Sequence, residues 1–361
     1  MNKVKNINEL EEELSNNSLG DEDVSIPEIY TLSYEVKSCA DLFRMHKSGQ
    51  LQIQPEFQRN FVWKPQVQTR FIDSLIRKLP IPSLFMGLDS KTEKYIIIDG
   101  LQRISTIIKF FDNPKWRMTR LPDIDERILG KKVEDIKEKT PELYSRVENL
   151  AIPVIIIRYD FSKQDSVDYL FTIFHRLNTG GQKLNNQEIR NCIYSSNFNN
   201  VLKSIAQSDE WENTMGKSSK IDRLESEELI LRVFAFMDKL DEYTGNLSKF
   251  LNHYMAEKKN AGDDEIGEKK DLLLSALSII EDEIEAPNEI GKMGRTVKEA
   301  LLVGIINNIT YLNDCTPAKI KDMFHTFIND DEFQEENLKS ALAQKDKVQT
   351  RLRKSIVIFS E

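Results

Sequence analysis

The stretch IIIDGLQRISTI, residues 96–107, decides how the first half of this chain folds. Its apolar, β-branched start is typical of a buried strand. Asp99 and Gly100 end that strand, and Leu101 and Ile104 then follow at the spacing of an amphipathic helix. The stretch therefore predicts a strand that passes through a glycine turn directly into a helix.

The segments on either side of this stretch predict a small sheet with helices. SLFMGL (83–88) has the composition of a second strand, and a polar turn between the two strands suits a hairpin. A helix is predicted to begin at Pro65, because apolar residues recur there at helical spacing and proline suits the first helical position. AIPVIIIRYD (151–160) predicts a further strand, and the charged residues 112–149 between them predict an insertion with short helices.

The second half of the chain has only helical patterns. A helix is predicted over residues 162–177, followed by the loop NTGGQKL (178–184). Asn185 is expected to cap the next helix, with Glu188 three residues later as in a capping box. From about residue 197 onward the apolar periodicity is helical throughout.

These patterns predict an α+β protein, with a small α/β core followed by a large all-helical domain. We expect a polar N-terminal tail over residues 1–30, the core over 31–195 and the helical domain over 196–361.

The composition excludes several classes of protein. The 361 residues carry a net charge of -9, whereas proteins that coat DNA through phosphate contacts are usually basic. Three scattered cysteines and four histidines show no metal-ligand spacing and no disulfide framework. No signal peptide and no apolar run of membrane-spanning length is evident, so a cytoplasmic location without membrane contact is expected.

The turn between Asp99 and Arg103 is the first candidate site. Backbone N–H groups and the helix dipole attract anions where a strand ends and a helix begins. Arg103 lies in the first helical turn, where the dipole disfavours a cation unless a negative group such as a phosphate is close. Asp99 could hold Mg²⁺ on that phosphate or orient a water. The structural alternative is that Asp99 caps the helix and pairs with Arg103.

Two further segments carry polar residues that packing alone does not explain. EFQRNFVW (56–63) places Arg59 among aromatic residues, where it either stacks on Trp63 with a structural carboxylate partner or contacts a ligand. The glycines of the NTGG segment (178–181) could form an anion-binding nest, and Asn178 and Arg190 could reach the same ligand. A tight turn between two helices accounts equally for this loop.

Taken in order, these segments resemble one family, the ParB/sulfiredoxin-like domain with a DGQQR motif that stands at the N-terminus of GmrSD-type modification-dependent restriction enzymes. The corresponding segments here are FQRNFVW, LPIPSLFMGL, IIIDGLQRISTI and FHRLNTGGQKLNNQEIRN. The resemblance covers about residues 35–255, and its specificity comes from the ordered set and not from any single motif.

The resemblance implies nucleoside-triphosphate binding or hydrolysis that controls DNA cleavage in an anti-phage system, with Mg²⁺ and a nucleoside triphosphate as cofactors. It implies that a group of residues surrounds the nucleotide, with Asp99, Gln102 and Arg103 in catalytic roles, Asp99 also on the metal, and the remainder in binding roles: Gln58, Arg59, Gly100, Asn178, Thr179, Gly180, Gly181 and Arg190. DNA, a separate nuclease or effector protein, and a second copy of the chain are the partners that it suggests.

Two departures from the family pattern bear on activity. The first glutamine of DGQQR is Leu101 here, which puts hydrolysis in doubt, and after residue 255 only His325 remains, so an HNH nuclease module is expected to be absent. Three functions therefore stay open: a Mg²⁺-dependent nucleotide hydrolase, a sensor of nucleotide or DNA that regulates an effector without turnover, and a direct nuclease.

Overall fold

The computed structural model describes residues 31–53, 63–160, 163–177, 184–216, 224–334, 337–338 and 342–361. These residues form two compact units, one within Val24–Lys183 and the other within Leu184–Glu361. The first unit contains a mixed sheet with helices, and the second is largely helical. The predicted α+β class is confirmed.

The first unit is built on a five-stranded sheet with the strand order β1-β5-β3-β4-β2. β1 pairs with β5 and β3 pairs with β4 in antiparallel fashion, whereas β5 with β3 and β4 with β2 are parallel. The predicted hairpin of residues 83–99 is the β3–β4 pair. The strands are β1 (Thr31–Ser38), β2 (Leu51–Gln52), β3 (Leu84–Asp89), β4 (Tyr95–Asp99) and β5 (Ala151–Tyr159).

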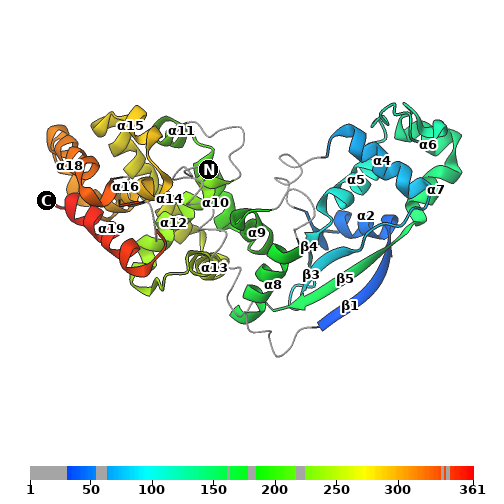
Figure 1. Ribbon diagram of the computed structural model, residues 1–361, viewed down its shortest axis with the longest axis horizontal. Coiled ribbons are helices and arrows are strands. Elements are labelled where there is room, and N and C mark those ends of the chain that lie inside the picture. The colour runs from blue at the N-terminus through cyan, green and yellow to red at the C-terminus, as the bar shows by residue number, and fades with distance from the viewer. Residues whose placement is uncertain are drawn as a thin grey trace, which may run out of the picture. The chain divides into compact units, whose positions relative to one another are not determined.

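Helices cover the sheet and create the core of this unit. One face of the sheet, including Met86, Ile97 and Val154, packs into a cluster with apolar residues of the helices drawn above it in Figure 1. On the opposite face, α8 contacts β4 and β5. The helices are α2 (Cys39–Lys47), α4 (Pro65–Ile76), α5 (Leu101–Asp112), α6 (Val133–Lys139), α7 (Pro141–Asn149) and α8 (Gln164–Leu177), with the 3₁₀ turn η1 (Glu126–Ile128).

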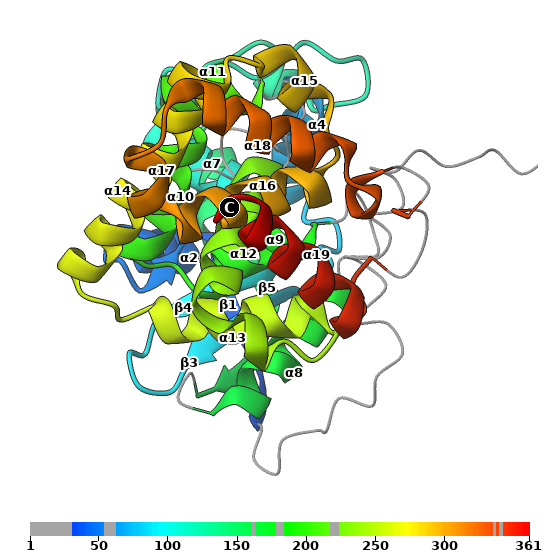
Figure 2. The same cartoon turned by 90° about the vertical axis from the view of Figure 1, so that its left-hand side faces the viewer.

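The helical unit is organised around α16 (Arg295–Asn307). Most residues of α16 are buried, including its whole apolar run from Ala300 to Ile306, and the helix packs against α12 (Glu225–Lys239) and α19 (Lys345–Ile358) (Figure 2). Gly304 permits the approach of α19, because a Cβ atom there would lie 2.3 Å from Ser355 Oγ.

The other helices of this unit surround that centre. The predicted capping box is confirmed, because Asn185 Oδ1 accepts a hydrogen bond from the Glu188 backbone N–H and the Asn185 backbone N–H donates one to the Glu188 carboxylate. The helices are α9 (Asn186–Ile193), α10 (Asn197–Ala206), α11 (Asp209–Met215), α13 (Leu247–Lys258), α14 (Asp263–Ile279), α15 (Pro287–Lys292), α17 (Ile309–Asn313) and α18 (Pro317–Asn329), with the short turns η2 (Leu240–Glu242), η3 (Ile280–Ile284, a π-helix) and η4 (Asp331–Phe333).

Candidate functional site

The turn between β4 and α5 has the backbone conformation that the sequence predicts. Asp99 is the last residue of β4, and Gly100 is the N-cap of α5 with a φ of 97°. That left-handed conformation favours glycine, and a Cβ atom at Gly100 would also lie 2.3 Å from the Leu84 side chain. Gly100 is therefore required for the chain to turn from the strand into the helix.

Arg103 is held in position across this turn. Its guanidinium donates to Asp99 Oδ2 at 2.7 Å and to the backbone carbonyl of Pro82. Burial lowers the pKa of Arg103, and the neighbouring Asp99 carboxylate opposes that shift. An arginine remains protonated in either case, so the turn holds a charged guanidinium, paired with the Asp99 carboxylate, beside the N-terminus of α5.

The structural alternative for this turn is correct in one part and wrong in the other. Asp99 does pair with Arg103, four residues later, as that alternative predicts. It does not cap α5, because Gly100 is the N-cap and no side chain makes a capping hydrogen bond there. The uncapped amino end of a 12-residue helix and the adjacent guanidinium both favour an anion at the same place.

Gln102 connects the turn to the segment that precedes α4. Its Oε1 atom accepts a hydrogen bond from the backbone N–H of Trp63 at 2.9 Å. The Trp63 ring lies edge-on to Phe71 of α4, with 5.5 Å between ring centroids. Gln102 thus holds the backbone of Trp63 against α5. The sequence predicted a contact of Gln102 with the nucleotide and gave no sign of this structural contact.

Leu101 packs as its position on the apolar face of α5 predicts. Its partly buried side chain contacts the core cluster of the first unit. The carbonyl of Pro82 was not among the predicted site residues. The two prolines of the LPIPS segment could have indicated this contact. Proline has no backbone N–H and interrupts regular backbone pairing, so carbonyl groups of such a segment are available to side-chain donors.

Arg190 lies in the helical unit and is fully buried there. Its guanidinium donates to Glu228 at 3.1 Å, to Asn252 at 2.9 Å and to Ser248 at 3.3 Å. These contacts hold α9 against α12 and α13. The predicted ligand contact of Arg190 stays a prediction, since the described contacts of its side chain are structural.

Six of the predicted binding residues lie outside the described residues: Gln58, Arg59, Asn178, Thr179, Gly180 and Gly181. The structure thus brings together Asp99, Gly100, Gln102 and Arg103 at one turn. In the described part of the chain, no group of three or more His, Cys, Asp or Glu residues is arranged to hold a metal ion. Asp99 fits a Mg²⁺ ion only as a single carboxylate ligand, with phosphate oxygens and waters completing the coordination.

The comparisons with known proteins identify the domain that carries this turn. Residues 39–195 match the family model described as the GmrSD restriction endonuclease, N-terminal domain, which confirms the resemblance inferred from the ordered motifs. Searches of curated proteins and of solved structures give no significant match. None of the helices described here is both long and apolar enough to cross a membrane.

Proposed function

Because residues 39–195 carry the N-terminal domain of the GmrSD restriction endonuclease family, we propose that this chain binds a nucleoside triphosphate and acts in a restriction-type defence system. The observation that carries the nucleotide part is the fixed Arg103 guanidinium beside the uncapped amino end of α5. A phosphate group at this place receives the helix dipole, backbone N–H groups and a charged donor together.

The proposed chemistry follows from the residues of this turn. Arg103 stabilises negative charge on the phosphates, and the carboxylate of Asp99 holds Mg²⁺ or orients a water. Hydrolysis forms a bond from a water oxygen to the γ-phosphorus and breaks the bond to the bridging oxygen. The products are a nucleoside diphosphate, inorganic phosphate and a proton. Mg²⁺ supplies charge neutralisation on the phosphate oxygens.

A second candidate function is nucleotide sensing without turnover, and two contacts favour it. Leu101 replaces a family glutamine with a side chain that packs into the core. Gln102, the remaining glutamine of the motif, is bonded to the Trp63 backbone. If both glutamine positions are structural here, neither is available to position an attacking water.

We expect Arg103→Ala to weaken binding of the preferred nucleotide at least about tenfold, because a hydrogen bond to a charged group contributes about 1.5–3 kcal/mol. The measurement is thermal stabilisation by each of the four ribonucleoside triphosphates with Mg²⁺. Arg77→Ala is the matched control, since Arg77 makes a similar pair with Asp73 four residues earlier on α4. Equal stabilisation of both variants by the nucleotide would place the ligand elsewhere.

Asp99→Asn separates binding from turnover. The amide oxygen can still accept from Arg103, so nucleotide stabilisation in the absence of Mg²⁺ is expected to remain near the wild-type level. Phosphate release with Mg²⁺ is expected to fall at least about tenfold, since the variant lacks the carboxylate. Binding without any phosphate release in the wild type, with and without DNA, would support the sensing function instead.

A further inference from the structure

A short antiparallel ribbon in the first unit, between α5 and α6 (Figure 1), carries a group of exposed basic side chains. Its two segments, residues 115–120 and 130–133, meet at an isolated bridge in which Arg117 lies opposite Lys132. Two cations directly opposite each other are unfavourable in an antiparallel pair unless an anion is close. The exposed basic residues of this ribbon, called the basic ribbon below, are Lys115, Arg117, Arg120 and Lys131.

The apolar side chains of the basic ribbon fix its backbone to the core. Trp116, Met118 and Val133 are buried and belong to the core cluster of the first unit. The backbone N–H of Thr119 donates to the hydroxyl of Thr69 on α4 at 3.0 Å. The basic side chains are therefore presented to solvent by a backbone that is already ordered.

Two guanidiniums of the basic ribbon converge on Gly130. Arg117 donates to the backbone carbonyl of Gly130 at 2.7 Å. Arg120 lies against the Cα atom of the same glycine, since a Cβ atom there would be 2.9 Å from Arg120 Nε. Gly130 thus leaves the space that Arg120 occupies, and Lys131 is the next residue in the chain. An oxyanion beside Gly130 can approach both arginines.

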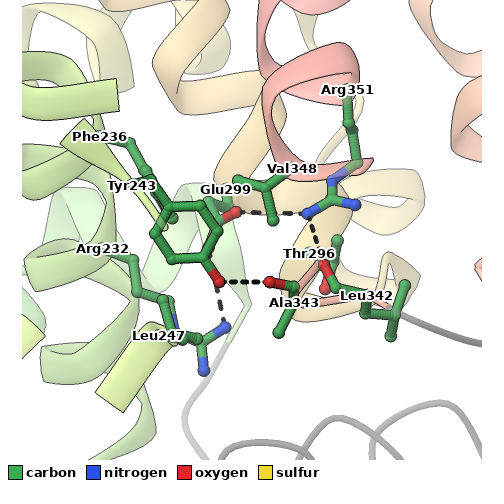
Figure 3. A pocket seen from close by; sticks show the side chains of 10 residues that line it. All are labelled: Arg232, Phe236, Tyr243, Leu247, Thr296, Glu299, Leu342, Ala343, Val348 and Arg351. Carbon is green, nitrogen blue, oxygen red and sulfur yellow. Dashed lines mark hydrogen bonds and ion pairs between the residues drawn. The ribbon is translucent and has the colours of Figure 1, made fainter. Parts of the chain in front are cut away.

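The carboxylates around the basic ribbon pair with other cations. These ion pairs are Asp112–Lys47, Asp123–Arg70, Asp125–Arg127 and Glu134–Lys132. Within the part of the chain that the structure describes, no ion pair joins a carboxylate to Lys115, Arg117, Arg120 or Lys131. The buried arginines of the helical unit differ, because Arg232 and Arg351 both pair with Glu299 (Figure 3). Between residues 115 and 132, the ion pairs above leave only the Glu126 carboxylate to oppose these four cations.

We propose that the basic ribbon contacts the phosphate backbone of duplex DNA, with Arg117 and Arg120 on one phosphate and the lysines beside it. Guanidiniums bind phosphate oxygens with two N–H groups at once, and each neutralised phosphate releases counterions from the duplex. These contacts carry no sequence information. The net charge of -9 restricts them to a local surface of the chain.

The composition of the basic ribbon favours a duplex over a single strand. Proteins bind unpaired bases by stacking them on aromatic side chains. Trp116 is the one aromatic residue between residues 115 and 132, and it is buried. The proposed contact goes beyond the nucleotide site at Asp99 and does not depend on it.

The test is binding of the full chain to a short fluorescent DNA duplex, followed by anisotropy at several salt concentrations without nucleotide or Mg²⁺. The double variant Arg117→Gln/Arg120→Gln is expected to bind about tenfold more weakly or worse at low salt. Its slope of log affinity against log salt is expected to be shallower by about 2, because each phosphate contact contributes about 0.9.

The matched control is Arg44→Gln/Lys47→Gln, which also removes two positive charges from exposed side chains of the first unit. Arg44 and Lys47 pair with Asp41 and Asp112, so this variant is expected to bind DNA like the wild type. Lys131→Gln leaves the hydrogen bond between Arg117 and Gly130 in place and is expected to reduce the salt slope by about 1.

Three outcomes would overturn the proposal. The first is a wild type that does not bind duplex DNA at low salt. The second is a control variant that loses as much affinity as Arg117→Gln/Arg120→Gln, because net charge alone would then explain the loss. The third is tighter binding of single-stranded DNA or of duplex RNA than of duplex DNA.

Discussion

Replacing Glu228 by glutamine is expected to lower the free energy of unfolding of the helical unit by about 3–5 kcal/mol. Glu228 is buried, and its carboxylate accepts hydrogen bonds from Arg232 at 2.5 Å and from Arg190 at 3.1 Å. Arg295 approaches it to 3.6 Å. Glutamine has nearly the same shape but no charge, so three guanidiniums lose a shared counter-charge in a poorly solvated interior.

Chemical denaturation followed by circular dichroism measures this loss. Glu225→Gln is the matched control, because Glu225 lies one turn earlier on α12 and pairs with Arg295 at 3.1 Å, but its side chain is half exposed. An exposed pair contributes at most about 1 kcal/mol. Similar denaturation midpoints for the two variants would show that the buried arginines are neutralised by other groups.

The same carboxylate is expected to make the stability of the helical unit depend on pH. Burial opposes ionisation of Glu228, but the positive charges of Arg232, Arg190 and Arg295 outweigh it and lower its pKa to about 2. The unfolded chain titrates near the ordinary value of 4.5. The stabilisation is therefore complete above pH 4.5 and is lost as the pH falls towards 2, by about 3 kcal/mol in total.

The effect of Glu228 is isolated by comparing the wild type with Glu228→Gln at each pH. Asp125, whose hydrogen bonds with Arg127 lower its pKa to about 2, contributes equally to both proteins and cancels in the difference. We expect the difference in unfolding free energy to be constant between pH 5 and 7 and to shrink steadily below pH 4.5. A difference that stays constant down to pH 3 contradicts the assignment.

Expected effects at Gly100 are smaller but test the turn directly. Gly100→Ala is expected to destabilise the first unit by about 2–3 kcal/mol, through the left-handed backbone and the contact with Leu84. Gly49→Ala is the control, because Gly49 also has a positive φ of 75° but has open space where a Cβ atom would be. The excess loss in Gly100→Ala over Gly49→Ala, measured by thermal unfolding, reports the packing contact alone.

Much of the first unit could be predicted from local sequence. The periods of apolar residues predicted α4, the β3–β4 hairpin, β5 and the passage from β4 into α5, and the structure has all of them. β1 was not predicted. Its apolar residues Leu32, Tyr34 and Val36 are exposed, while Ser33 and Glu35 lie on the more covered side. A pattern with this polarity does not indicate which face of a strand packs on the core.

At the candidate site, sequence alone determined the residue types and the backbone turn. Asp99, Gly100 and Arg103 lie within five consecutive positions, so their proximity is a local property of a strand that enters a helix. Tertiary structure decided what those side chains contact. Arg103 bonds to Pro82, and Gln102 bonds to Trp63, because the hairpin and the segment before α4 fold back onto α5.

For the helical unit, sequence determined that helices form and where several of them begin, since capping and periodicity act over a few residues. Only the tertiary structure decided that Arg190 and Glu228, far apart in sequence, are buried together. The same holds for Arg232, Glu299 and Arg351, which line one cavity. In the sequence, a charged residue in a helix looks the same whether it faces solvent or the core. It is buried only where another helix, distant in sequence, places an opposite charge beside it.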